Sequence, residues 1–293
     1  MQFLAYALIY PLLWGLSKLP FKGLYVVSDG VYLILYYGIG YRKKTVQKNL
    51  KLAFPEYTPV QLKTIEKQFY HHLCDLFLEM IKSISISEKQ LRQRMVFTNP
   101  EVMQQFEDRN QNAIIIMGHY ASYEWLTAFQ FYLKNPSFGV YKRVKNPYFD
   151  RMVHRIRSRW NTTMLANKTV HRVMQRHISS GQVASYGFIA DQSPRRARGQ
   201  QWFSFLGMEL PFFTGVERIA RNFNLPVLHL NVRKLKRGHY EGTFQLLTER
   251  PQEREEYALT SAFAKALEAQ IKEAPQYYLW THERFKHLGK KQK

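Results

Sequence analysis

Two long apolar runs open the chain. Residues 1–17 hold no charged side chain, and residues 23–41 hold only Asp29. As a helix, the first run extends about 25 Å, slightly less than the roughly 30 Å hydrocarbon core of a bilayer. The pattern predicts one or two N-terminal membrane helices that span the bilayer or lie in its interface. The alternative is a buried helical pair in a soluble core.

Aromatic and basic residues follow the second run. Its end carries Tyr36, Tyr37 and Tyr41, and residues 42–44 are Arg-Lys-Lys. Tyrosine is enriched at membrane interfaces, and Lys and Arg gather on the cytoplasmic side of a membrane segment. We therefore expect residues 1–41 to form a membrane-anchoring segment. Residues 42–293 are expected to form one domain on the cytoplasmic face.

From residue 58 the spacing of apolar residues becomes helical. Apolar side chains recur every three or four positions over residues 58–84. Thr58 and Gln61 have the spacing of a capping box, and Ser87 and Gln90 repeat it. The sequence predicts a long helix over 58–84 and another helix that begins after Ser87.

Beyond residue 95, short apolar runs alternate with amphipathic ones. We expect strands at residues 113–117, 138–141, 183–189, 227–232 and 277–280, and helices at residues 122–133, 148–160, 170–178, 215–224 and 258–272. Alternation of this kind is typical of an α/β fold, in which helices flank a mostly parallel central sheet.

The amino-acid composition limits the classes of binding partner. Of 293 residues, 43 are Lys or Arg and 22 are Asp or Glu, so the net charge is +21. This excess of positive charge favours nucleic acid, an anionic membrane or an anionic substrate as the binding partner. The single cysteine, Cys74, excludes an intramolecular disulfide and a cysteine-based metal site. The cations follow the apolar N-terminus and gather again at Lys286, Lys290, Lys291 and Lys293. This distribution favours an anionic membrane, and we expect no nucleic-acid partner.

One short motif carries candidate chemistry. Residues 113–117 are wholly apolar, Gly118 breaks the predicted strand, and His119 is followed five residues later by Glu124. Open α/β sheets bind ligands at the carboxyl ends of their strands, where this histidine falls. We expect Glu124 to hold one imidazole nitrogen of His119 and to leave the other free to take a proton. The alternative is a histidine packed under a loop.

Further blocks accompany Gly118-His119-x4-Glu124 in a fixed order. They are Arg42…Asn49-Leu50…Phe54-Pro55-Glu56, Tyr141-Lys142-Arg143…Asn146-Pro147, Arg159-x-Asn161, Ala190-Asp191-Gln192, Phe205-Leu206-Gly207…Thr214-Gly215 and Pro275-Gln276-Tyr277-Tyr278-x-Trp280-x-His282-x-Arg284. Together they resemble the lipid A biosynthesis acyltransferases, the late (lauroyl/myristoyl) branch of the lysophospholipid acyltransferase superfamily. The resemblance runs over nearly the whole chain. Lys142 departs from the pattern, because the family more often has Arg there.

The resemblance implies a membrane-associated O-acyltransferase with a glycerolipid acyltransferase-like fold. Its acyl donor would be an acyl-carrier-protein thioester, with acyl-CoA as the other possibility, and its acceptor a hydroxyl of a lipid A precursor. His119 would be the general base and Glu124 would orient its ring. No metal or cofactor is expected. The location implied is the cytoplasmic face of the bacterial inner membrane. The alternatives are an acyltransferase that uses an aminolipid, another glycolipid or a lysophospholipid, and a membrane scaffold without activity.

The remaining candidates concern substrate binding. A tetrahedral intermediate needs a donor for its negative oxygen, and we expect Arg159 in this role, with Lys142 second. Asp191 would pair with Arg159 or position the acceptor together with Gln192, or it would simply cap a turn. Three arginines lie just beyond this block and are expected to form a phosphate receptor; they are Arg195, Arg196 and Arg198. Their alternative is a solvated loop near lipid headgroups.

Overall fold

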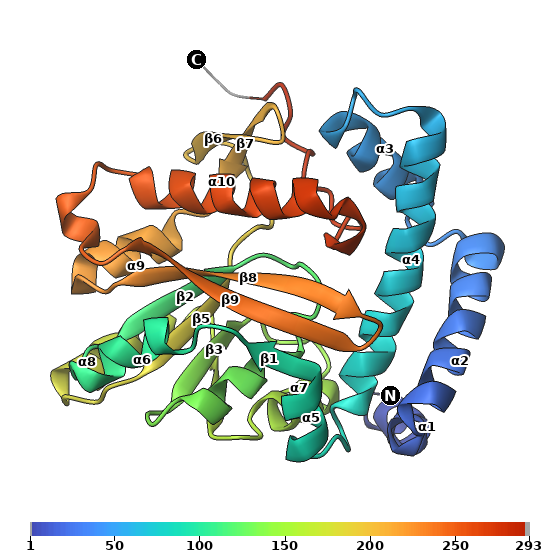
Figure 1. Cartoon of the computed structure of the whole chain (residues 1–293), viewed down its shortest axis with the longest axis horizontal. Coiled ribbons are helices and arrows are strands. Elements are labelled where there is room, and N and C mark those ends of the chain that lie inside the picture. Colours follow the sequence, from blue (N-terminus) through green and yellow to red (C-terminus); the bar gives the residue numbers. More distant parts are fainter. Residues whose placement is uncertain (1, 291–293) are drawn as a thin grey trace.

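A seven-stranded sheet forms the centre of the molecule, with helices on both sides (Figure 1). The computed structural model describes residues 2–290, so Lys291 and Lys293 of the predicted basic cluster lie outside the described residues. The helices are α1 (Gln2–Lys18), α2 (Phe21–Leu33), α3 (Lys43–Ala53), α4 (Pro59–Lys82), α5 (Glu88–Arg94), α6 (Glu101–Asp108), α7 (Pro147–Arg157), α8 (Val170–Ser179), α9 (Gly215–Phe223) and α10 (Ala258–Glu273).

The strands of this sheet follow the order β1-β9-β8-β2-β5-β3-β4. They are β1 (Met95–Phe97), β2 (Ala113–Met117), β3 (Ser137–Tyr141), β4 (Thr162–Ala166), β5 (Ser185–Ile189), β8 (Val227–Lys236) and β9 (His239–Thr248). Every neighbouring pair is parallel except the β8–β9 hairpin. The predicted α/β class with a mostly parallel sheet is therefore confirmed. A separate hairpin pairs β6 (Gln201–Phe205) with β7 (Met208–Phe212).

The central strand shows why this sequence folds as a sheet. All five residues of β2 are buried, as a strand needs when helices cover both faces of a parallel sheet. In Figure 1, α10 lies on one side of β8 and β9, and α6 and α8 lie on the other. Both predicted capping boxes are present, at Thr58–Gln61 and at Ser87–Gln90. They fix where α4 and α5 begin.

Several predicted elements differ from the structure. The helix expected at 122–133 is a loop followed by the 3₁₀ helix η2 (Trp125–Tyr132). The strand expected at 277–280 is wrong: the 3₁₀ turn η4 (Pro275–Tyr277) precedes it, and only Tyr278 forms a single bridge, to Tyr120. The segment is apolar because Tyr278 and Trp280 are buried. The backbone of Tyr277 and Leu279 bonds to the turn that carries His119, and not to a neighbouring strand.

The N-terminal runs form α1, α2 and the π-helical segment η1 (Ile34–Ile39). Among the described residues, no single helix combines the length and the hydropathy that crossing a bilayer requires. Only residues 21–39 taken with residues 43–53 meet these criteria together, and the two parts are bent by 92°. In Figure 1 both α1 and α2 lie beside the lower half of α4. Two backbone carbonyls near the end of α1, of Ser17 and Leu19, accept hydrogen bonds from Lys82 of α4, each 2.7 Å long.

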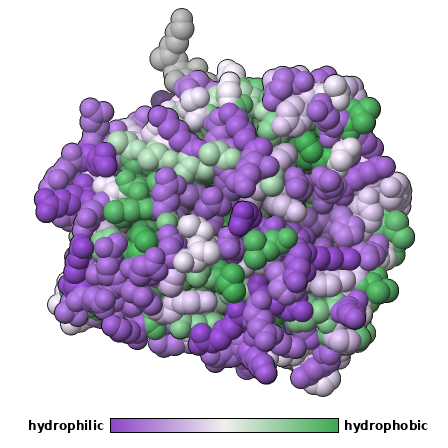
Figure 2. Space-filling model, in the orientation of Figure 1, coloured by the Kyte–Doolittle hydropathy of each residue, from purple (hydrophilic) through white to green (hydrophobic). Residues whose placement is uncertain are grey.

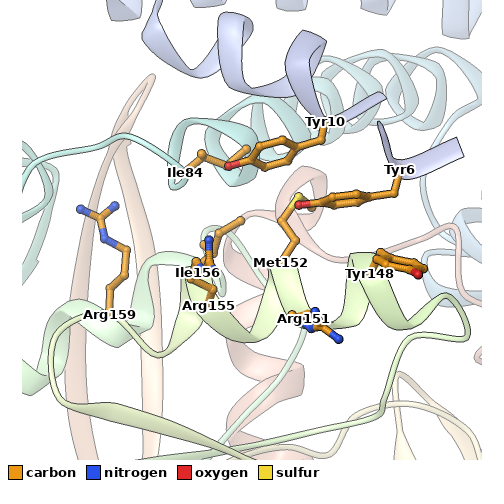
Figure 3. A pocket seen from close by; sticks show the side chains of 9 residues that line it. All are labelled: Tyr6, Tyr10, Ile84, Tyr148, Arg151, Met152, Arg155, Ile156 and Arg159. Atoms are coloured by element: carbon orange, nitrogen blue, oxygen red, sulfur yellow. The ribbon is translucent and has the colours of Figure 1, made fainter. Parts of the chain in front are cut away.

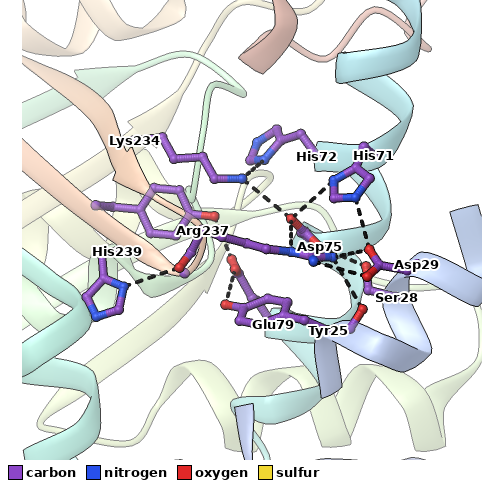
Figure 4. Close-up of polar contacts among 12 residues, drawn as sticks. Tyr25, Ser28, Asp29, His71, His72, Asp75, Glu79, Lys234, Arg237 and His239 are labelled. Carbon is purple, nitrogen blue, oxygen red and sulfur yellow. Dashed lines mark hydrogen bonds and ion pairs between the residues drawn. The ribbon is translucent and has the colours of Figure 1, made fainter. Parts of the chain in front are cut away.

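A polar cluster joins α2, α4 and the β8–β9 hairpin (Figure 4). The carboxylate of Asp75 on α4 is fully buried and accepts hydrogen bonds from Arg237 and from Ser28. Arg237 also pairs with Asp29 of α2. Burial of the charged Asp75 is tolerated because each oxygen has a cationic or hydroxyl partner. The cluster therefore fixes the N-terminal helices to the sheet.

Candidate active site

The register of two neighbouring strands brings His119 and Asp191 together. Met117 of β2 pairs with Ile189 of β5, and each functional residue lies two positions beyond its own strand. The Nδ1 atom of His119 lies 2.7 Å from Oδ1 of Asp191. Because both strands run in the same direction, their carboxyl ends meet at one sheet edge, where α/β folds bind ligands.

A strained turn presents His119 at this edge. A side chain at Gly118 would meet the Cδ1 atom of Leu267 of α10 at 2.6 Å, so Leu267 packs closely against this glycine. Ala121 takes a left-handed conformation with φ of 48°, and its N–H donates to the carbonyl of Tyr277. The carbonyl of His119 accepts from the N–H of Leu279. Residues 277–279, far away in sequence, therefore hold the turn in place.

Glu124 does not hold the imidazole as expected. It forms a bidentate ion pair with Arg157 at the end of α7, with Nε of Arg157 2.9 Å from Oε2. The physical reason is the loop between His119 and η2: it directs the Glu124 side chain toward α7, while β5 supplies a nearer carboxylate. His119 therefore has a carboxylate partner, but this partner is Asp191 and not Glu124.

Burial and the charge of the partner shift the pKa values of His119 and Asp191 in opposite directions. Burial lowers the pKa of His119, but the charge of Asp191 and the hydrogen bond to it, with a smaller effect of Glu124, outweigh burial. The pKa of His119 is therefore raised above 6.5. Burial raises the pKa of Asp191, but His119 outweighs it and the pKa is lowered. Arg157 opposes protonation of His119, which places its charge within electrostatic reach of the imidazole.

The second ring nitrogen of His119 faces the substrate side. Nε2 lies 3.4 Å from Nε2 of Gln192, and the ring of Tyr123 stands edge-on to the imidazole at 5.1 Å. The His119 side chain is 19% exposed, whereas Asp191 is 2% exposed. Since a carboxylate accepts, Nδ1–H of the neutral ring donates to Asp191 and Nε2 keeps its lone pair. Nε2 is therefore the ring nitrogen that can accept a proton.

The loop that follows Asp191 is anchored by the segment 282–287. The N–H of Ser193 donates to Nε2 of His282 at 3.0 Å, and its hydroxyl donates to the carbonyl of Arg284. Burial lowers the pKa of His282 to about 4. His282 is therefore neutral at pH 7 and accepts a hydrogen bond. Arg284 is buried and donates to the carbonyl of Pro211, which links the β6–β7 hairpin to the site.

An apolar cavity of about 170 Å³ opens beside Glu124. Most of its wall comes from α4 and from the turn segments near His119. The lining residues are Tyr41, Leu73, Leu76, Phe77, Met80, Tyr123, Glu124, Leu279 and Thr281. Because Tyr123 borders both this cavity and His119, the cavity adjoins the histidine pair.

The other predicted site residues do not join this cluster. Arg159 donates to the backbone carbonyls of Ser83 and Ile86, at 2.9 Å each, and does not pair with Asp191 as expected. Its position two residues beyond the end of α7 directs it to the loop after α4. The remaining cations are exposed and make no hydrogen bond or ion pair to His119 or Asp191 among residues 2–290; they are Lys142, Arg195, Arg196 and Arg198.

Two features of the site were not found from the sequence. Arg157 received no role, and Asp191 was not matched to His119. Asp191 had a detectable signal, since it follows a second apolar strand as His119 follows the first. Arg157 had none, because its ion pair with Glu124 depends on how α7 docks. In the part of the chain that the structure describes, no group of three His, Cys, Asp or Glu side chains is arranged to hold a metal ion.

Comparison with known proteins shows the family of this chain. A family profile described as bacterial lipid A biosynthesis acyltransferase matches residues 1–287. The chain is 24% identical over 275 residues to the lipid A biosynthesis lauroyltransferase of Escherichia coli K12, with 94% of this chain and 89% of that protein covered. It is 21% identical over 283 residues to the lipid A biosynthesis palmitoleoyltransferase of the same strain and to a lipid A biosynthesis acyltransferase of Shigella flexneri, with 94% and 88% covered.

The α/β fold and these matches together define an acyltransferase. More particularly, the chain belongs to the bacterial lipid A biosynthesis acyltransferase family. The resemblance drawn from the sequence blocks is thus confirmed, as is the assignment of the protein as an enzyme.

Proposed function

We propose that the protein transfers a fatty acyl chain from a thioester to a hydroxyl of a lipid A precursor, with His119 as general base. The observation that carries this proposal is the His119–Asp191 pair, 2.7 Å apart at the carboxyl edge of the sheet and next to an apolar cavity. An acyl-carrier-protein thioester is the proposed donor, and acyl-CoA is the alternative.

The proposed reaction needs no covalent enzyme intermediate, because a thioester is already activated. Nε2 of His119 takes the proton of the acceptor hydroxyl while Asp191 stabilises the imidazolium. The alkoxide oxygen attacks the thioester carbonyl and forms a tetrahedral intermediate. The carbon–sulfur bond then breaks, the thiolate leaves, and it takes the proton from His119. The products are an ester and a free thiol.

The oxyanion of that intermediate requires a nearby donor. We propose the Gln192 amide, because its Nε2 lies 3.4 Å from Nε2 of His119. Arg157 contributes a positive charge that already acts on His119 while it is held by Glu124. Arg159 is a weaker candidate than expected, since two of its nitrogens are occupied by backbone carbonyls.

The apolar cavity beside Glu124 is the proposed entry for the acyl chain. Its wall carries Leu73, Leu76, Phe77 and Met80 of α4, and burying hydrocarbon there is favourable by about 0.8 kcal/mol per methylene. Tyr123 stands between this wall and His119, so a chain held in the cavity places its carbonyl near the base.

Association with the cytoplasmic face of the bacterial inner membrane is the proposed location. Apolar side chains of α1 and α2 project into solvent, with Leu8 and Leu12 of α1 74% and 69% exposed and Val26 of α2 71% exposed. Clustered exposed apolar residues mark a surface that binds something apolar. We propose that residues 1–41 lie in the interface and anchor the catalytic domain of residues 42–293.

The acceptor is proposed to be anionic, since the chain carries a net charge of +21. Arg195, Arg196 and Arg198 follow Asp191 on an exposed loop and remain candidates to bind its phosphate. An aminolipid, another glycolipid or a lysophospholipid is the alternative acceptor.

Purified full-length His119→Ala tests the proposal. Transfer of an acyl chain from acyl carrier protein to a lipid A precursor, followed by mass spectrometry, should fall by about 10²–10⁴. The matched control is His171→Ala, which removes an exposed imidazole on α8. Far-ultraviolet circular dichroism should show both variants folded. A folded His119→Ala enzyme with wild-type turnover would contradict the mechanism, and wild-type enzyme that acylates only a lysophospholipid would contradict the acceptor.

A further inference from the structure

A second and larger cavity lies away from the histidine pair, between α1 and α7 (Figure 3). It holds about 440 Å³. Two tyrosines of α1 face several side chains of α7 across it, as Figure 3 shows. The lining residues are Tyr6, Tyr10, Ile84, Tyr148, Arg151, Met152, Arg155, Ile156 and Arg159. None of them lines the cavity beside Glu124. We call this space the α1–α7 cavity.

Its α7 wall carries cations with no anionic partner. Arg151 and Arg155 are one helical turn apart, so they project from the same face of α7. Both are exposed, and within residues 2–290 neither forms an ion pair with a carboxylate. Arg159, one turn further, is held by two backbone carbonyls and packs against Trp160. Two uncompensated guanidiniums at one cavity select an anion, and their planar forks suit phosphate.

The opposite wall, on α1, consists of tyrosine rings that carry hydroxyl groups. Tyr6 stacks on Tyr10 at 5.2 Å and on Tyr148 at 5.8 Å between ring centroids. Neither Tyr6 nor Tyr10 donates its hydroxyl to another described residue. A tyrosine with an apolar ring and an unpaired hydroxyl fits the boundary between hydrocarbon and headgroup. The cavity therefore offers an apolar wall on α1 and a cationic wall on α7.

One apolar side chain of α1 continues this surface. Phe3 is 56% exposed and its ring lies 5.3 Å from that of Tyr148 in the cavity wall, whereas Leu4, Leu8 and Leu12 lie on the opposite face of α1. A molecule whose charged group sits between Arg151 and Arg155 can thus lay hydrocarbon on Phe3 and the Tyr6 ring. The ligand chemistry that matches both parts is an amphiphile with one phosphate and an acyl chain.

We propose that the α1–α7 cavity binds the phosphate headgroup of an anionic phospholipid of the membrane leaflet, with its acyl chains along α1. This site is separate from the acyl-transfer site and goes beyond the function proposed above. Arg157, which holds Glu124 beside His119, lies on the same helix as Arg151 and Arg155. A bound phospholipid would therefore brace α1 against the helix that positions the active site.

Methionine methyl resonances provide a local test. Met152 lines the α1–α7 cavity and Met80 lines the cavity beside Glu124. Full-length protein with ¹³C-methyl methionine, in a neutral detergent, is titrated with dihexanoyl phosphatidylglycerol. We expect a saturable shift of the Met152 resonance, assigned with Met152→Leu, and an unchanged Met80 resonance. Dihexanoyl phosphatidylcholine, a zwitterion with the same chains, should shift Met152 much less.

Charge variants complete the test. Arg151→Gln/Arg155→Gln should weaken phosphatidylglycerol binding by at least tenfold, because each charge-assisted contact is worth about 1.5–3 kcal/mol. The control is Arg172→Gln/Arg176→Gln, which removes two exposed arginines from α8 and lowers the net charge equally. It should bind as the wild type does. Arg151→Lys/Arg155→Lys keeps both charges but loses the planar forks, so it should restore only part of the lost affinity.

Four outcomes would overturn the proposal. Equal shifts of the Met152 resonance by the two phospholipids would mean that the cavity binds the hydrocarbon chains and does not recognise the charge of the headgroup. A matching shift with inorganic phosphate at the same concentration would mean that it binds a free anion. A shift of Met80 without Met152 would place the ligand in the acyl-transfer cavity. An equal loss in both arginine pairs would reduce the effect to net charge. None of these outcomes depends on acyl transfer, so the function proposed above is tested separately.

Discussion

Asp191 acts on His119 against the effect of burial, and the balance sets when the base is available. The neutral imidazole, which can accept the proton of a hydroxyl, becomes populated as pH rises through the raised pKa of His119. The charges of Glu124 and Arg157 have smaller effects on the pKa of His119: Glu124 raises it and Arg157 lowers it. The pH dependence of the rate should therefore depend more on Asp191 than on any other neighbour.

We expect kcat/KM to rise with pH around a midpoint above 6.5. In Asp191→Asn the largest influence that raises the pKa is gone, burial dominates, and the midpoint should move to lower pH. The plateau rate should also fall by about 10²–10⁴, because the imidazolium loses its counter-charge. Asp108→Asn is the control, since it neutralises an exposed carboxylate that pairs with Lys134. A midpoint that stays in place in Asp191→Asn would be inconsistent with this account.

Glu124 and Arg157 should behave as one unit. Removing Glu124 leaves the three-quarters buried side chain of Arg157 without a partner, which should cost about 1.5–3 kcal/mol of stability as well as activity. The double variant Glu124→Ala/Arg157→Ala should then be little worse than Glu124→Ala alone. Thermal unfolding and turnover of all three variants give this cycle. Additive losses would show that the two residues act independently.

At this scale the sequence predicted the place of His119 at a strand end, but not its contacts. The spacing of His119 and Glu124 along the chain suggested a direct contact between them. The actual contact of His119 comes from the register of β2 with β5, and Asp191 lies 72 positions away in sequence. Pairings that depend on sheet register or on helix docking, such as Glu124 with Arg157, leave no local trace.

Helix α4 connects the N-terminal segment to the sheet, and the polar groups of some of its side chains are buried in the fold. Glu79 is fully buried and accepts hydrogen bonds from Tyr25 of α2 at 2.9 Å and Tyr240 of β9 at 2.8 Å. Burial raises the pKa of Glu79 to about 7 from an ordinary 4.5. Around neutral pH this carboxyl group therefore changes charge inside the protein.

The fold should lose stability as pH rises from about 4.5 to 7, because over that range the folded state holds the Glu79 proton and the unfolded chain does not. A shift of this size corresponds to about 3 kcal/mol. Glu79→Gln should remove that slope and should be the more stable protein above pH 7. Urea unfolding at several pH values measures the difference. The control, Glu88→Gln, changes an exposed carboxylate on α5 and should keep the wild-type slope.

Element by element, long periodic patterns were predicted well and short ones were not. The capping boxes and apolar spacing marked α4, and the buried run of β2 was unmistakable. The strands β4 and β9 were missed because their polar residues interrupt the apolar pattern. The late aromatic segment was taken for a strand because it is apolar and buried, although its partners lie in the His119 turn.

On the whole molecule, hydrophilic residues cover most of the face in Figure 2, and apolar ones form small separate groups. The exposed apolar side chains of α1 are an exception, because they lie together on one helix. A net charge of +21 adds attraction to an anionic surface, but that attraction is screened by salt. Membrane binding should therefore have a salt-sensitive part and a salt-resistant part.

We expect the protein to stay bound to anionic vesicles in about 1 M NaCl, where charge attraction acts over only about 3 Å. Leu4→Ser/Leu8→Ser/Leu12→Ser should abolish this salt-resistant binding, since each buried leucine contributes about 1.5–3 kcal/mol. Val60→Ser removes a side chain that is 76% exposed on α4 and serves as the control. Flotation on a sucrose gradient separates bound from free protein. Complete release of the wild type by salt would show that the attachment is electrostatic.

The turn that carries His119 is supported by residues 277–279, and this has a consequence for biosynthesis. His119 and Asp191 have both been made shortly after synthesis has passed β5, but the carbonyl of Tyr277 and the N–H of Leu279 have not. The left-handed turn at Ala121 then lacks its hydrogen-bond partner, so a nascent chain cannot hold the base in its final position. Acyl transfer should begin only after translation has delivered that late segment, which keeps an unfinished enzyme from acting on the membrane.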